Sequence, residues 1–241
     1  MKMHPLQPIR KMTMKPYPFC TTLLAFVMSA ALLSPTLAQS FDQAGLTKYL
    51  YPNPQTTGFG RVLDDLESMA VGPHQMRNES DPGNWAHELT HHVNAAFRSE
   101  ASRIFGRQGN GFYVLSGYAI MLPEPNVTLK QVATLIPQKH RSDTYKEYVI
   151  ASQRWWNKEP LFMLDEAVAA MNGLEYHVDK GTPDRGREIL MRDWLVLVPY
   201  LLEAVEKFDP GYSHHDELKN FISWQLAYAD YLATLHNRLD D

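Results

Sequence analysis

Two histidines four residues apart, His87 and His91, stand in the segment His-Glu-Leu-Thr-His, with Glu88 beside the first. In an α-helix a four-residue step is about 400° of rotation and about 6 Å of rise, so both imidazoles project from one face and can share a metal ion. Glu88 flanks that face, where a carboxylate can accept a proton from water that zinc has acidified to a pKa of about 7. The spacing therefore predicts a catalytic zinc site with Glu88 as its general base.

The residues around this motif predict the helix that it needs, over about residues 83–105. Asp81 can cap the helix and Pro82 suits its first position. Apolar residues then recur at helical spacing, at Leu89, Val93, Ala96 and Phe97. The alternative is a surface helix of a binding protein whose histidines are solvated and never meet a metal.

A catalytic zinc ion usually has three protein ligands and one open position, so the two histidines need a partner. The metzincin pattern would require Gly at position 94 and His at position 97, where this chain has Asn94 and Phe97. The only cysteine is Cys20, near the N-terminus, so a cysteine ligand is excluded from the rest of the chain. An acid from a second helix remains as the third ligand.

Glu166 is the acid that helical geometry favours, on a helix expected over residues 160–179. Small side chains at Ala169, Ala170 and Gly173 share its stripe and would let this helix approach the zinc helix closely. The first alternative is Asp165, which is rotated by about 100° from Glu166 and needs a different helix orientation.

A second alternative for the third ligand is His177, which shares the face of Glu166. His177 lies about 16 Å farther along the helix, so the two cannot bind one ion. We therefore expect Glu166 to complete the site, with Asp165, His177 or another residue as the alternatives.

The segment Pro160–Ala169, with the sequence PLFMLDEAVA, resembles the stretch that carries the third zinc ligand in gluzincin-type HExxH metallopeptidases, which include thermolysin-like and aminopeptidase-like enzymes. Met163 stands where Trp is common in that clan, and Ala167 where Gly is common. The resemblance implies that His87, His91 and Glu166 bind one Zn²⁺ ion and that the substrate is a peptide or protein. Thermolysin-like sites also place an acid four residues after the glutamate ligand, where this chain has Ala170, so another group must orient one histidine.

Two further parts of a peptidase remain to be assigned. The transition state needs a donor for the developing oxyanion, and Tyr148, Tyr176 and His177 are candidates on elements expected near the ligand helix. Zincins commonly bind substrate backbone at a strand edge, and residues 111–122 are the candidate strand region here. That region follows the zinc helix, whereas the sheet of the family precedes it.

Residues 1–38 have the pattern of a secretory signal peptide. They contain four basic residues and no acidic one, an apolar run over 19–33, and a small-residue cleavage site after Ala38. The run is short for a membrane span, so we expect one exported domain over 39–241, periplasmic or extracellular, without stable membrane insertion after cleavage. An uncleaved anchor is the alternative.

Charge and cysteine content narrow the function further. The whole chain has a net charge of −4, and losing the four positive charges of the leader would leave −8. An acidic chain does not favour nucleic-acid binding, which requires a basic surface to neutralise phosphates. Cys20 lies inside the leader, so the mature protein would have no disulfide and no nucleophilic thiol.

Helical periodicity dominates the remainder, which predicts a mainly α (α+β) fold, a zincin-like helical domain with a small β-hairpin or short sheet. The strand pattern, in a hairpin or one bulged strand, is confined to residues 111–122. Besides the zinc helix, helices are expected over 42–51, 60–70, 128–135, 142–156, 160–179, 182–208 with a kink at Pro199, and from a cap at Ser213 to 239.

These observations together predict an exported zinc metallopeptidase. The first alternative is a zinc-binding adaptor or structural module without catalytic activity. The second is a metallohydrolase of a non-peptide amide or ester, such as a cell-wall component.

Overall fold

The structure, a computed structural model, describes residues 45–72 and 81–239. The leader predicted over 1–38 lies outside the described residues. Within them the fold is mainly helical with one small antiparallel sheet, which confirms the predicted fold class. No helix of this described part is long and apolar enough to cross a membrane.

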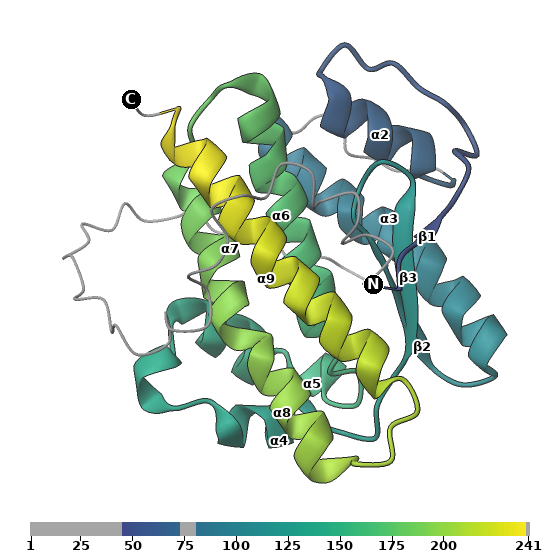
Figure 1. Cartoon of the computed structure of the whole chain (residues 1–241), viewed down its shortest axis with the longest axis vertical. Coiled ribbons are helices and arrows are strands. Elements are labelled where there is room, and N and C mark those ends of the chain that lie inside the picture. Colours follow the sequence, from purple (N-terminus) through teal and green to yellow (C-terminus); the bar gives the residue numbers. More distant parts are fainter. Residues whose placement is uncertain (1–44, 73–80, 240–241) are drawn as a thin grey trace. The chain divides into compact units, whose positions relative to one another are not determined.

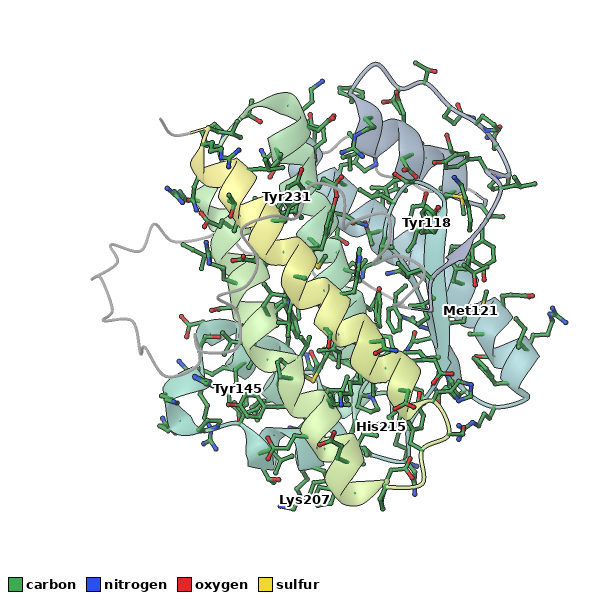
Figure 2. The ribbon with its side chains drawn as sticks, viewed as in Figure 1. Tyr118, Met121, Tyr145, Lys207, His215 and Tyr231 are labelled. Carbon is green, nitrogen blue, oxygen red and sulfur yellow. The ribbon has the colours of Figure 1, made fainter. Side chains whose placement is uncertain are left out.

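The sheet has three strands in the order β1-β3-β2, all antiparallel. Strands β2 (Gly109–Tyr113) and β3 (Tyr118–Pro123) form the hairpin that the sequence predicts, with Gly111 opposite Met121. Figure 2 labels Tyr118 and Met121 on β3, the central strand. Gly117 in the turn has φ 79°, a conformation that glycine adopts without steric cost.

The helix expected over 42–51 is wrong where the structure describes it. Thr47–Lys48 form strand β1 instead, with Thr47 paired to Ala119 and Lys48 to Tyr118. The next residue continues the pairing, since the Tyr49 amide donates to the Gly117 carbonyl at 2.7 Å. Backbone bonds to an open strand edge outweigh the local helical pattern here, because β3 would otherwise leave that edge unpaired.

The helices expected over 60–70, 83–105, 128–135, 160–179 and from 213 to 239 are present with small shifts in their ends, whereas those over 142–156 and 182–208 are each divided. The α-helices are α2 (Arg61–Met69), α3 (Pro82–Phe105), α4 (Leu129–Leu135), α5 (Gln153–Trp156), α6 (Phe162–Lys180), α7 (Arg185–Leu197), α8 (Pro199–Phe208) and α9 (His215–Asn237). Pro199 starts α8, so the expected kink is a break between two helices. His214 rather than Ser213 is the N-cap of α9.

The helix expected over 142–156 is divided into two elements. Its first part is a π-helix, η3 (Tyr145–Ala151), which begins at Tyr145, labelled in Figure 2. Its second part is the short helix α5, and a 3₁₀ turn, η2 (Gln138–His140), precedes both. Single π-helical turns are uncommon and frequently lie at functional sites.

Helix α6 occupies the centre of the helical layer (Figure 1). It contacts α3, α7, α9, α2 and β2, and every residue from Phe162 to Tyr176 is buried. Its first turn begins where the buried Glu124 carboxylate accepts a hydrogen bond from the Leu161 amide at 3.2 Å. A carboxylate placed early on α6 must therefore lie inside the protein, against the neighbouring helix α3.

Candidate metal centre

Helix α3 brings His87 and His91 together as their spacing predicts. The Asp81 side chain caps the helix by accepting from the Gly83 amide at 2.9 Å, and Pro82 occupies the first turn. The two histidine rings meet edge to face, with their Nε2 atoms 3.2 Å apart. Two ring nitrogens at this distance can share a proton or a metal ion between them.

Glu166 reaches the same point from α6. Its Oε2 atom lies 3.8 Å from His87 Nε2 and 3.7 Å from His91 Nε2. Four ligands about 2.1 Å from a tetrahedral zinc ion lie about 3.4 Å from one another, close to these spacings. The three residues offer ligand atoms that all lie within 4.8 Å of one another, so this group could hold a metal ion.

The environment of Glu166 also fits a cation. Its Oε2 atom is buried and has no hydrogen-bond partner among the described residues. Burial raises the pKa of Glu166 to about 7, although His91 opposes that rise. An unsatisfied buried carboxylate oxygen is costly, and a positive ion at this point would stabilise its charge.

The stripe of small residues on α6 explains how this carboxylate comes so close to α3. Ala169 and Ala170 are completely buried. A Cβ atom added at Gly173 would lie 3.2 Å from the Gly83 carbonyl oxygen and 3.5 Å from His87 Cβ. The helices are therefore in near-backbone contact one turn before the histidines, as the sequence predicts.

Asp165 takes a different place from the one considered for it as a ligand. Its Oδ2 atom lies 3.2 Å from His91 Nδ1, the ring nitrogen on the other side from Glu166. Asp165 also accepts hydrogen bonds from Asn94 at 2.6 Å and from Arg98 at 2.9 Å. The adjacent acids thus contact the same imidazole from both sides, so Asp165 supplies the orienting carboxylate that Ala170 cannot.

The two histidines differ in charge because of these neighbours. Burial disfavours the charged form of His91, but the Asp165 carboxylate outweighs it and raises the pKa of His91 to about 9. Burial, the charge of His91 and the charge of Arg187 together lower the pKa of His87 to about 3. His87 therefore presents an unprotonated nitrogen at neutral pH, as a metal ligand must, whereas His91 is protonated without a metal and would have to release its proton when an ion binds.

A chain of polar side chains connects this centre to the sheet. Arg98 binds Asp165 and donates to the Asn110 side chain on β2, and its guanidinium lies over the Trp156 ring, 5.4 Å from the centroid. Asn110 in turn donates to Glu124 at 2.5 Å. Burial raises the pKa of Glu124 to about 8, against hydrogen bonds from the Leu161 amide and Asn110. The sheet therefore positions Asp165 through side chains.

The candidate strand region 111–122 is already hydrogen-bonded by helical side chains at Tyr113, on the outer edge of β2. The Tyr113 amide donates to Asn94 at 2.7 Å, and the Tyr113 carbonyl accepts from Asn172 at 3.2 Å. A Cβ atom added at Gly111 would fall 2.3 Å from Phe97 Cβ, so α3 lies directly against this strand. Helical side chains therefore occupy the outward backbone groups of Tyr113, and α3 covers the face of the strand at Gly111.

Glu88 lies on α3 next to His87 with an exposed side chain. The charge of Glu88 raises the pKa values of both His91 and Glu166, although burial and the charge of Asp165 affect each of them more. Glu88 therefore lies near the centre. An exposed carboxylate beside the three ligands is free to meet water, which is the position expected for a general base.

The three candidate oxyanion donors, Tyr148, Tyr176 and His177, have different surroundings. Tyr148, on η3, has its pKa raised by burial and then by the charges of Glu166, Glu147 and Glu88, and its ring packs edge-on against Trp194. Tyr176 is buried in a cluster with α2, and the charges acting on it are Asp81 and Asp179.

His177, near the C-terminal end of α6, packs against the first turn of α3 and is not among the candidate ligands. A Cβ atom added at Gly83 would collide with its ring, and its Nδ1 atom lies 3.1 Å from the Thr182 carbonyl oxygen. Of the three candidates, Tyr148 is the one whose pKa is affected by the charges of Glu166 and Glu88.

Sequence reasoning missed Arg187. This residue lies on α7, and its Nη2 atom donates to Asn84 at 2.7 Å and to Asp81 at 3.3 Å, both at the start of α3. No local motif marks it, because only the packing of α7 against α6 brings its side chain to the zinc helix.

Comparisons with models of known protein families, with curated proteins and with solved structures gave no match. The functional argument therefore depends on the geometry of the described residues.

Proposed function

We propose that this chain is an exported zinc-dependent peptidase whose ion is held by His87, His91 and Glu166. The observation that carries the proposal is the buried Glu166 oxygen, which faces two imidazole nitrogens and has no hydrogen-bond partner among the described residues. Two nitrogens and one carboxylate oxygen are the ligands of zinc in many hydrolases, whereas calcium and magnesium favour sites made of oxygen alone. Three ligands leave one coordination position for the reaction.

The residues around the ligands have separate tasks in this proposal. Zinc, when bound, polarises the substrate carbonyl and lowers the pKa of water. Glu88 accepts the proton of the attacking water and passes it to the leaving amine. Tyr148 donates a hydrogen bond to the developing oxyanion from the η3 side. Asp165 holds the ring of His91 in place through Nδ1.

Export and the substrate class have sequence support. Residues 1–38 have the composition of a secretory signal, and peptide or protein is the substrate class that the gluzincin resemblance implies. The net charge of −4 gives no support to nucleic acid as a partner.

The decisive experiment is Glu88→Gln. Since Glu88 is exposed and is not a ligand in this proposal, the variant should retain one zinc ion per chain and lose at least about 1000-fold in kcat on a peptide library. Zinc is measured by elemental analysis and cleavage by mass spectrometry. The matched control is Glu100→Gln on the same helix, where the exposed carboxylate pairs only with Arg103.

Each alternative predicts a different result. Unchanged turnover in Glu88→Gln would reject the mechanism. One equivalent of zinc with no cleavage by the wild type would instead indicate a zinc-binding module, and cleavage of wall fragments alone would indicate a hydrolase of non-peptide amides or esters.

A further inference from the structure

Two arginines adjoin the metal centre, and they differ in how much of each guanidinium the protein uses. Arg98 donates to Asp165 and Asn110 and lies over the Trp156 ring. Arg187 donates only from Nη2, so its Nε and Nη1 atoms have no hydrogen-bond partner among the described residues. Arg98 thus uses its guanidinium in contacts within the protein, whereas Arg187 retains N–H donors that could bind a ligand.

Arg187 extends from α7 to the start of α3, where it contacts Asn84, about one turn before the metal ligands. Its partner Asn84 precedes His87 by three residues, a rise of about 4.5 Å. A Cβ atom added at Gly173 would lie 3.9 Å from Arg187 Cδ and 3.5 Å from His87 Cβ, so the three residues meet. The arginine is therefore adjacent to the centre, and its side chain retains 14% exposure.

The surrounding charges restrict what this arginine can bind. Glu88 and Glu147 are exposed near the centre and would repel an anion from their side of it. At the start of α3, Arg187 and the positive end of the helix dipole attract an anion, although the Asp81 carboxylate, 3.3 Å from Nη2, offsets part of the arginine's charge. Since Nη2 is already used by Asn84 and Asp81, the guanidinium can offer a carboxylate its charge and single donors at Nε or Nη1.

We propose that Arg187 binds the free C-terminal carboxylate of the substrate, so that the peptidase releases single residues from the C-terminus. This inference rests on the proposed function. One residue separates the scissile carbonyl from such a carboxylate and spans about 3.5 Å. That span matches the offset of about one helical turn between Asn84 and His87.

The test uses the zinc-loaded Glu88→Gln protein and two probes that it cannot hydrolyse, N-acetyl-Ala-Ala and its C-terminal amide. Calorimetry should show the acid binding at least about 10-fold more tightly than the amide, since charged hydrogen bonds contribute about 1.5–3 kcal/mol. Adding Arg187→Gln should abolish this preference without changing zinc content. Arg187→Lys, which keeps the charge but loses the Nε and Nη1 donors, should give an intermediate preference.

Arg192→Gln is the matched control on the same helix, because Arg192 pairs with Glu188 and its side chain is 46% exposed. It should keep the preference for the acid. Equal affinity of Glu88→Gln for the two probes overturns the proposal without any change at Arg187, and so does a preference that survives Arg187→Gln.

Hydrolysis by the wild type is measured separately on longer peptides with free and amidated ends. A wild type that cleaves both equally well, at internal bonds, refutes the carboxylate site and supports the peptidase. A wild type that cleaves neither, in a protein that still binds the acid preferentially, refutes the proposed function and supports the carboxylate site.

Discussion

Helix α6 carries two buried glutamates that differ in how their charges are satisfied. Glu175, 5% exposed, accepts from Arg61 at 2.6 Å through one oxygen and from Tyr228 at 2.7 Å through the other. Glu166, 6% exposed, faces two histidines, and its Oε2 atom has no donor among the described residues. Residue type, helix and burial are the same at the two positions.

The difference shows which of the two carboxylates stabilises the fold and which is available to a ligand. A buried acid with both oxygens paired holds neighbouring elements together, as Glu175 does for α2, α6 and α9. A buried acid with an unpaired oxygen stores an electrostatic cost that a cation would remove. Burial alone would have ranked the two as equivalent.

The largest effect that tests this contrast is on metal binding. Glu166→Gln should weaken zinc binding by more than about 100-fold, beyond the range of outer-shell changes, and leave the metal-free protein as stable as the wild type or more so. Glu175→Gln should retain zinc and lower the free energy of unfolding by about 1–2 kcal/mol, a value reduced because Arg61 is half exposed. Zinc titration and thermal unfolding measure the two quantities.

The contrast fails if the two variants behave alike. Full zinc occupancy in Glu166→Gln would remove this residue from the ligands, and loss of zinc in Glu175→Gln would mean that the distant cluster controls the site.

A smaller effect should come from the acid next to Glu166. Asp165→Asn keeps the shape but removes the charge that His91 and Arg98 share, so we expect zinc affinity to fall by about 10- to 100-fold. Competition with a chelator of known affinity measures it. An affinity equal to that of the wild type would show that the backbone of α3 alone orients His91.

The smallest effect concerns the approach of the helices. Gly173→Ala places a methyl group 3.2 Å from the Gly83 carbonyl oxygen, so α3 must shift by a few tenths of an ångström. We expect a loss of about 1 kcal/mol in stability and a several-fold loss in zinc affinity.

Gly211→Ala is the control for this substitution, because its Cβ would meet nothing within 4 Å. It should leave both quantities unchanged. A Gly173→Ala protein with wild-type zinc affinity would show that the metal centre tolerates movement of α6.

Much of the centre could be predicted because its signals are local. The spacing of His87 and His91 fixes their shared face once a helix forms, and Asp81 and Pro82 mark where that helix begins. Predicting Glu166 needed one further inference, because the small residues on its stripe indicate that another helix packs closely against α6 there.

The remainder depended on contacts that no local pattern encodes. Sequence reasoning considered Asp165 only as a metal ligand. In the structure it contacts Nδ1 of His91, whereas Glu166 faces Nε2 of the same ring. Arg187 comes from another helix, placed by the packing of α7 on α6. The misassigned helix over 42–51 fails for a related reason, because pairing with β3 decides the conformation of Thr47–Lys48.

The occupied backbone groups of Tyr113, at the edge of β2, have a consequence for self-association. Exposed strand edges invite the sheets of other molecules to add to them, which starts aggregation. In this protein Asn94 and Asn172 occupy the outward backbone groups of Tyr113, and Asn94 also holds Asp165. The Asn94 side chain thus blocks strand addition at Tyr113 and also holds Asp165, which contacts His91. We therefore expect its loss to lower solubility and metal affinity together.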